Sequence, residues 1–393
     1  MKKEYSLCGV IIIIVATAII SALSTGILIM RNYSTDDGQS YSQIIKDENM
    51  QEFIDVYSKL TNNYYEDVDK KAMIDSAING MTSYLGDQYT GLLDEDKSTS
   101  LYDSLNAKYE GIGITIKENY IENVLYNSSA AKAGLKMNDK IISINDINIE
   151  NMNSDEIKNI IEQNKTNKID LKIMRNDEIR DFNNLKMTSI DYPNLRYSFV
   201  ENENIGYIKI NLFSNNINKQ LEYALSQLNS YYGLIIDLRN NAGGYLEEAY
   251  QTAEIFLTKG SIVYSLLDKD NKKKEFKDKT NDKQTVPIVV LVNGNTASAA
   301  EILAGALKDS YGAILIGSQT YGKGKVQHTY SLSSGEMVKY TTSLWYRPNG
   351  TNIDGIGITP DYQIENDVET TESVETNLID NQYNKAIEIL KNN

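Results

Sequence analysis

The chain has 393 residues, 41% of them hydrophobic, which is enough for two or three domains with sizeable cores. One cysteine and one histidine exclude an internal disulfide, a clustered-cysteine metal site and a multi-histidine metal centre. The 39 basic and 54 acidic residues give a net charge of −15, which argues against nonspecific nucleic-acid binding because such binding depends on neutralising phosphates.

The N-terminus predicts a membrane anchor. Residues 7–30 carry no charge, and a bilayer takes about 20 apolar residues to cross. Two lysines precede this run, and lysines favour the cytosolic side. We expect residues 1–6 in the cytosol, a single-pass anchor in the cell membrane at 7–30, and a linker at 31–49 that begins the extracytoplasmic part. A cleaved signal peptide is the alternative, with Ala16-Thr17-Ala18 as a poor cleavage signal.

The next two regions differ in their periodicity. Over 50–104 the apolar residues follow a helical period, as at Phe53, Val56, Tyr57 and Leu60. Over 105–187 short β-rich runs appear at 113–116, 141–144 and 169–173, with an amphipathic helix at 154–163. This change predicts an N-terminal helical region followed by a small, separate β-rich module.

The region 188–362 alternates apolar strands with helices. The expected strands are 206–212, 233–238, 288–292 and 313–316, and the expected helices are 219–228, 246–258 and 299–309. Continuous apolar strands are typical of a sheet covered on both faces, so we expect an α/β core. The charged stretch 268–283 is expected to be a solvated hairpin tip, and 363–393 a C-terminal helical segment.

Active sites of open α/β sheets lie at the carboxyl ends of the strands, and polar loops leave the strand ends here. Ser298 follows the strand at 288–292 and begins a helix, whose unpaired N–H groups favour developing negative charge. A plain helix cap is its alternative role. Lys323 lies between two glycines after the strand at 313–316. Burial lowers the pKa of such an amine toward the range of a general base, whereas a surface turn is the default reading.

A third loop carries Gly243 and Gly244 immediately before a helix. Adjacent glycines there can direct two backbone N–H groups at one spot, as an oxyanion hole does, although an ordinary strand-to-helix turn has the same residues. One site needs a nucleophile, a base and an oxyanion hole at a shared sheet edge, so the three loops support one another.

These loops resemble those of the carboxyl-terminal processing proteases, also called tail-specific proteases, and the resemblance covers residues 50 to 393. Ser298-Ala299-Ala300-Glu301-Ile302 resembles the family's Ser-Ala-Ser-Glu-Ile block, and Gly322-Lys323-Gly324-Lys325-Val326-Gln327 resembles the run around its general base. Asn240-Asn241-Ala242-Gly243-Gly244 resembles its Asn-Pro-Gly-Gly turn, with alanine in place of proline. Gly357-Ile358-Thr359-Pro360-Asp361 resembles its closing block, and Leu85-Gly86-Asp87-Gln88-Tyr89-Thr90 the block before its PDZ module.

The resemblance implies a role for each matching residue. Ser298 would be the nucleophile, Lys323 the general base and Gln327 the residue that orients the lysine. Gly243 and Gly244 would supply the oxyanion site, together with the Ser298 amide or its neighbour, and Asp309 would support the site. A Ser298–His328 pair is the rival catalytic reading, but His328 lacks a marked acidic partner and on a strand should face away from Gln327.

The β-rich module at 105–187 resembles a PDZ domain. Gly111, Ile112, Gly113 and Ile114 resemble its carboxylate-binding loop, whose N–H groups would capture a chain end while the adjoining strand pairs with the peptide. Plain strand glycines are the alternative for Gly111 and Gly113.

The resemblance therefore implies a crotonase- or Clp-protease-like α/β core with an inserted PDZ domain. We expect a membrane-anchored serine endopeptidase that binds exposed C-termini of protein or peptide substrates and cuts them with a Ser–Lys dyad. No metal, nucleotide or other cofactor is implied, and a homodimer through the terminal helices is compatible with the sequence. The alternatives are a catalytically silent PDZ scaffold and an acyl-CoA enzyme of the crotonase fold; the second rests on fold analogy alone.

Overall fold

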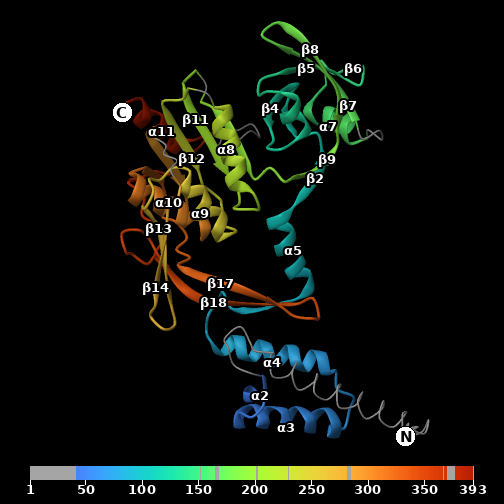
Figure 1. The fold of residues 1–393 in the computed structure, drawn as a ribbon, viewed down its shortest axis with the longest axis vertical. Coiled ribbons are helices and arrows are strands. Elements are labelled where there is room, and N and C mark those ends of the chain that lie inside the picture. Colours follow the sequence, from blue (N-terminus) through green and yellow to red (C-terminus); the bar gives the residue numbers. More distant parts are fainter. Residues whose placement is uncertain are drawn as a thin grey trace, which may run out of the picture. The chain divides into compact units, whose positions relative to one another are not determined.

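The computed structural model describes residues 41–150, 152–163, 168–200, 202–228, 230–280, 285–365, 367–369 and 377–392 (Figure 1). The chain divides into two units, one ending at Met81 and the other beginning at Thr82.

The first unit consists of helices. It holds α2 (Tyr41–Ile44), α3 (Glu48–Asn63) and most of α4 (Lys70–Tyr84). Asp47 caps α3 by accepting hydrogen bonds from the N–H groups of Asn49 and Met50. The anchor predicted at 7–30 lies outside the described residues, and among the residues that are described no helix is long and apolar enough to cross a membrane.

The second unit opens with a connector to the β-rich module. The connector holds β1 (Gly91–Leu93) and α5 (Glu95–Asn106). The chain then enters the module through β2 (Lys108–Gly111) and leaves it through β9 (Thr188–Asp191). These two strands pair antiparallel, so the entry and exit of the module lie side by side.

The module is a curled sheet with its own core. Its strand order is β3-β4-β5-β7-β8, and β6 pairs with β5. The strands are β3 (Ile114–Lys117), β4 (Tyr120–Val124), β5 (Lys140–Ile144), β6 (Ile147–Asn148), β7 (Lys168–Arg175) and β8 (Glu178–Lys186), and the helices are α6 (Ser129–Ala133) and α7 (Ser154–Glu162). Among the described strands β3 pairs only with β4, so its other edge is free.

The core of the second unit is a six-stranded sheet of order β10-β11-β12-β15-β16-β19. Its strands are β10 (Leu195–Phe199), β11 (Ile205–Ile210), β12 (Gly233–Asp237), β15 (Ile288–Val292), β16 (Ile314–Gly317) and β19 (Tyr362–Gln363), and all pairs except β10–β11 are parallel. Its helices are α8 (Ile217–Gln227), α9 (Leu246–Glu254), α10 (Ala299–Ala306) and α11 (Asn381–Lys391).

Both faces of this sheet are covered, which explains the continuous apolar strands. Ile236 and Val290 pack with residues of α8, α9 and α10. Ile235 and Val289, their neighbours along the strands, pack with α11 on the other face. The predicted α/β core is therefore confirmed.

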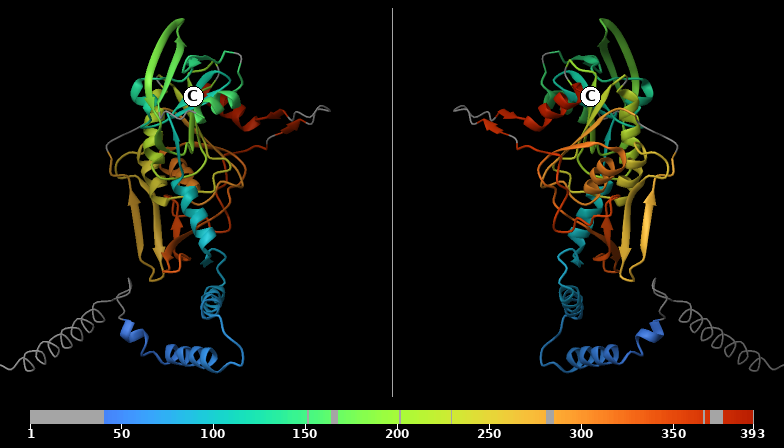
Figure 2. Two further views of the ribbon diagram at one scale, coloured as in Figure 1. Left: turned by 90° about the vertical axis from the view of Figure 1, so that its right-hand side faces the viewer. Right: turned by 90° about the vertical axis from the view of Figure 1, so that its left-hand side faces the viewer.

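A second sheet was not predicted. The long strand β18 (Met337–Tyr346) pairs with β1, with β17 (Lys325–Ser331) and with β13 (Ile262–Asp268), which in turn pairs with β14 (Lys273–Lys277). The charged stretch from 268 is the turn and second strand of the β13–β14 hairpin, drawn in gold in Figure 2. The helix predicted at 299–309 ends its α-helical part at Ala306 and continues as a π-helix, η1 (Leu307–Tyr311).

The C-terminal segment is only partly helical. Besides α11 it contains a short antiparallel pair, β20 (Asp367–Glu369) and β21 (Asn377–Ile379).

The β-rich module packs on the edge of the core sheet. Tyr197 of β10 donates its N–H to Asn123 Oδ1 at 2.8 Å and its hydroxyl to the Val124 carbonyl at 3.1 Å. The rings of Tyr126 and Tyr223 meet edge to face beside this contact. Strand β4 of the module is thus fixed to strand β10 of the core.

Candidate active site

Three adjacent parallel strands bring the predicted loops together. β12, β15 and β16 are neighbours in the core sheet, so the loops that follow them leave the same edge. The loop after β12 carries Gly243 and Gly244, the loop after β15 carries Ser298, and the loop after β16 carries Lys323. The carboxyl edge of the sheet therefore gathers all three features predicted there.

Ser298 occupies a strained backbone position at the start of α10. Its φ of 55° lies in the left-handed region, which non-glycine residues adopt mainly where surrounding contacts hold them. Two contacts do so. The Ser298 N–H donates to Glu301 Oε2 at 2.9 Å. A Cβ on Gly243 would lie 2.8 Å from the Ser298 Cβ, so only glycine allows this approach.

Two backbone N–H groups beside Ser298 are available to an oxyanion. The N–H groups of Gly244 and Ala299 donate to no described residue. The Gly243 N–H, in contrast, donates to Asn241 Oδ1 at 2.9 Å, and the Ser298 N–H is taken by Glu301. Of the predicted oxyanion donors, the geometry therefore leaves Gly244 and the neighbour of Ser298.

Glu301 joins the serine loop to the lysine loop. Its side chain is fully buried, and besides the Ser298 N–H its carboxylate accepts Thr320 Oγ1 at 2.6 Å, the Gly322 N–H at 2.7 Å and the Lys323 N–H at 2.9 Å. Burial raises the pKa of this carboxyl, and the four hydrogen bonds oppose that rise. One acceptor thus fixes the backbone on both sides of the site.

Lys323 carries its amine into a partly buried position. Burial lowers the pKa of the amine, the nearby Lys339 ammonium lowers it further, and Glu301 acts in the opposite direction. Ser298 and Lys323 line the same cavity, although no hydrogen bond joins Ser298 Oγ to Lys323 Nζ in this structure. The lowered pKa is what a lysine general base requires.

The cavity has a volume of about 410 Å³ and is largely apolar. One wall is the strand β17, and another is helix α5, through Leu101, Tyr102 and Leu105. Gln327 and His328 both line it, as do their neighbours Lys325, Val326 and Thr329. The pairing with β18 is irregular between Val326 and Gln327, but Gln327 and His328 follow one another in register after that point. The expectation that these two residues face apart therefore stays a prediction.

Neither residue is hydrogen-bonded to Ser298 or Lys323. Gln327 Nε2 donates to Thr341 Oγ1 at 3.3 Å. His328 is exposed, and its imidazole has no hydrogen-bond or ion-pair partner among the described residues. The rival Ser298–His328 pair thus lacks the third group that would orient an imidazole base.

Asp309 lies outside the cavity. It forms a two-pronged ion pair with Arg347, at 3.0 Å to Nε and 2.5 Å to Nη2, and both side chains are buried. The ion pair ties η1 to the residue that follows β18, and the supporting role expected of Asp309 stays a prediction.

The predicted carboxylate loop of the β-rich module lies next to the free edge of β3. The N–H groups of Ile112 and Gly113 donate to no described residue, and Ile114 begins β3. Gly113 has φ of 86° and packs so closely that a Cβ would lie 2.1 Å from the Ser128 Cβ. Gly111 belongs instead to β2, where it pairs with Thr188.

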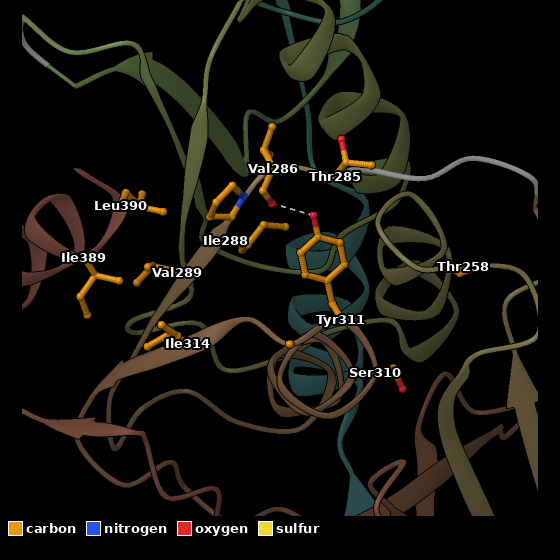
Figure 3. Close-up of a pocket in the computed structure, with 12 residues that line it drawn as sticks. Thr258, Thr285, Val286, Ile288, Val289, Ser310, Tyr311, Ile314, Ile389 and Leu390 are labelled. Carbon is orange, nitrogen blue, oxygen red and sulfur yellow. Dashed lines mark hydrogen bonds between the residues drawn. The ribbon is translucent and has the colours of Figure 1, made fainter. Parts of the chain in front are cut away.

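Another cavity lies at the opposite, amino edge of the core sheet. It is formed around the beginnings of β15 and β16, with Tyr311 donating its hydroxyl to the Val286 carbonyl at 2.7 Å (Figure 3). Tyr311 is the only titratable residue among those that line it. Among the described residues no group of three or more His, Cys, Asp or Glu side chains could hold a metal ion.

Sequence reasoning missed two contributors to the site. One is Glu301 of the Ser298–Ile302 block. Ser-x-x-Glu before an apolar run is the signature of a capping box, and this signal could have assigned a role to Glu301. The wall supplied by α5 was not foreseen, since its residues are far from Ser298 in the sequence and an apolar helix face does not reveal what it will cover.

Comparisons with known proteins identify the family of this chain. Residues 204–364 match the Peptidase family S41 model, 103–174 the PDZ domain model and 23–97 the model of the activating protease CtpB N-terminal domain. The carboxy-terminal processing protease CtpA of Bacillus subtilis is 33% identical over 93% of this chain and 78% of its own, and the carboxy-terminal-processing protease of Bartonella bacilliformis is 32% identical over 87% and 80%. Among solved structures, a photosystem II D1 C-terminal processing protease aligns over 81% of this chain and 88% of its own, at 24% identity and a TM-score of 0.48. The chain therefore belongs to peptidase family S41, the serine-type carboxy-terminal processing proteases, and carries a PDZ domain.

Proposed function

We propose that this protease cuts peptide bonds with a dyad in which Ser298 is the nucleophile and Lys323 the general base. The observation that carries the proposal is the shared cavity, where the strained serine meets a lysine whose burial lowers the pKa of its amine. Neutral Lys323 Nζ takes the proton of Ser298 Oγ as that oxygen attacks the carbonyl carbon of the substrate. The amine must move within the cavity to reach the hydroxyl.

The remaining steps use the backbone donors beside the serine. The oxyanion of the tetrahedral intermediate accepts the N–H groups of Gly244 and Ala299. The Lys323 ammonium then protonates the leaving amine, and the C–N bond breaks to leave an acyl ester on Ser298. A water molecule, deprotonated by Lys323, attacks that ester; the bond from the acyl carbon to Ser298 Oγ breaks, Lys323 returns the proton to that oxygen, and the new carboxyl end is released. Gln327 is proposed to steady the lysine during this cycle.

We further propose that the PDZ domain captures the C-terminus of the substrate. The free N–H groups of Ile112 and Gly113 suit a terminal carboxylate, and the free edge of β3 can accept the adjoining peptide as an added strand. A peptide amidated at its C-terminus is the matched control, because it retains every side chain but loses the carboxylate.

The uncharged run at 7–30 supports a single-pass anchor in the cell membrane, with the protease outside the cytosol. The predicted homodimer through the terminal helices stays a prediction. Treating membranes that hold the full chain with a protease from the outer side tests the orientation, because only an extracytoplasmic domain is digested.

The dyad is tested with the full chain in detergent and an unfolded substrate such as casein. Wild type should cleave it, while Ser298→Ala and Lys323→Ala should not. Cleavage by Lys323→Ala at the wild-type rate would exclude the lysine as base and return attention to His328. The rate should also rise with pH toward the pKa of Lys323, which lies below that of a free lysine, since only the neutral amine accepts a proton.

A further inference from the structure

The backbone of Lys323 is fixed, but its side chain is not. The Lys323 N–H donates to Glu301, and its carbonyl accepts Trp345 Nε1 at 2.8 Å. No described residue forms a hydrogen bond or an ion pair with Lys323 Nζ. A lysine side chain has four rotatable bonds, so the group that contacts the amine decides where the amine lies.

Tyr89 is that group. Lys323 Nζ lies 5.2 Å from the centroid of the Tyr89 ring, within the distance at which an aromatic face attracts a cation. Lys325 Nζ lies over the same ring at 5.7 Å. Tyr89 belongs to the run 85–90, whose residues have no role in the proposed catalytic steps or in the proposed PDZ binding.

The segment that carries Tyr89 is itself fixed to β18 and to Lys325 of β17. Asp87 accepts Thr341 Oγ1 at 2.5 Å, Thr90 Oγ1 at 2.7 Å and Lys325 Nζ at 3.1 Å. Burial raises the pKa of Asp87, but these hydrogen bonds outweigh it and lower the pKa to about 2. The next residues form β1, which pairs with β18. The run is thus fixed to the β17–β18 hairpin.

We propose that Tyr89 is a positioning residue for Lys323, whose ring seats the amine inside the cavity at the edge where Ser298 lies. This inference rests on the proposed Ser298–Lys323 dyad. Tyr89 lies outside residues 204–364, the stretch matched by the peptidase family model. A residue of the segment before the PDZ domain therefore positions the general base of the peptidase core.

The ring has two consequences for the amine. It limits the positions that Nζ visits, and it stabilises the ammonium relative to the neutral amine. The other titratable groups around Lys323 come from several elements, namely Glu301 of α10, Lys339 of β18, Lys325 and His328 of β17, Tyr102 of α5 and Tyr245 before α9. Tyr321 and Asp354 act on Tyr89 itself. Replacing Tyr89 by another neutral side chain adds or removes none of these charges.

The test uses the full chain with Tyr89→Leu, which removes the ring, and Tyr89→Phe, which keeps it. Tyr330→Leu is the matched control, because Tyr330 is an exposed tyrosine of the β17–β18 hairpin, to which the segment of Tyr89 is fixed. We expect Tyr89→Leu to lower kcat ten- to a hundredfold, since a small misplacement of a catalytic group costs about that much. KM should stay within about twofold, because Tyr89 does not line the cavity. Tyr89→Phe and Tyr330→Leu should match wild type.

The pH profile separates positioning from a merely structural effect. Loss of the ring should move the acid limb of kcat downward by about half a pH unit, because the ammonium loses its aromatic partner. A Tyr89→Leu protein with wild-type kcat and an unmoved acid limb would overturn the proposal. So would Tyr89→Phe being as impaired as Tyr89→Leu, because the hydroxyl would then be the active part.

Two further measurements keep the result decisive. Should Tyr89→Leu fail to fold, as judged by circular dichroism, Tyr89→Met with its more flexible side chain takes its place under the same criteria. Ser298→Ala and Lys323→Ala are measured beside them. Activity in those two would refute the proposed dyad, whereas their inactivity together with a fully active Tyr89→Leu would refute only the positioning role.

Discussion

Replacing Glu301 by glutamine should damage both halves of the active site at once. The carboxylate accepts four hydrogen bonds, two on each oxygen: Thr320 and Gly322 on Oε1, and Ser298 and Lys323 on Oε2. A glutamine has only one oxygen. Whichever way its amide is turned, an NH₂ group faces backbone N–H groups that need an acceptor.

The loss of stability depends on which orientation of the glutamine amide is less unfavourable. With the NH₂ group on the Oε1 side, only the Gly322 N–H loses its acceptor, because the Thr320 hydroxyl can turn to accept. An unsatisfied buried donor costs about 1–3 kcal/mol, and the remaining bonds weaken because their acceptor is no longer charged. Relief from burying a charge offsets part of this. We expect a loss of about 2–3 kcal/mol in the free energy of unfolding.

Urea unfolding and casein cleavage measure the two effects together. Cleavage should fall about tenfold or more, because the loop that carries Lys323 shifts relative to Ser298. Glu254→Gln is the matched control: Glu254 is also buried, accepts the Lys279 N–H at 3.0 Å and lies away from the cavity. If Glu301→Gln were no less stable and no less active than Glu254→Gln, the bridging role of Glu301 would be refuted.

Three other substitutions have expected outcomes. Gly243→Ala should abolish cleavage, since its Cβ would press on Ser298. Gly260→Ala is the control, because Gly260 is also at positive φ but has open space around it; this variant should lose only about 1 kcal/mol of unfolding free energy and keep full activity. Equal activities of the two variants would refute the close packing. Asp309→Asn should lower stability by about 3 kcal/mol in urea unfolding, because it leaves a buried guanidinium unpaired, and an unchanged midpoint would contradict this. Asp87→Asn should destabilise the protein at pH 7. Its difference from wild type in unfolding free energy should shrink as pH falls from about 4 toward 2, because the depressed pKa of Asp87 contributes stability only above that window. A difference that does not change with pH would contradict this role of Asp87.

The central part of the fold was predictable because its signal is local. The strands at 233–238 and 288–292 are continuous apolar runs, as strands covered on both faces must be, and each is followed by a polar loop. Parallel neighbours place such loops at one edge, so Ser298 and Lys323 could be expected to meet before the structure was known.

The parts that escaped prediction have no local signal. The β17–β18 hairpin is only half-buried and carries lysine, glutamine and threonine among its apolar residues, so its strand period is weak. The contact of Tyr89 with Lys323 joins residues far apart in the sequence, through a segment that reads only as a turn.

The contact between β4 and β10 has a consequence for making shorter forms of the protein. β10 is the edge strand of the core sheet, and Asn123 of the PDZ domain occupies the outward N–H of Tyr197. Excising the domain would bare this edge and remove the partners of the Tyr197 N–H and hydroxyl. An open strand edge invites pairing with other chains, so we expect an isolated peptidase core to aggregate. The PDZ domain thus also covers part of this edge of the core sheet.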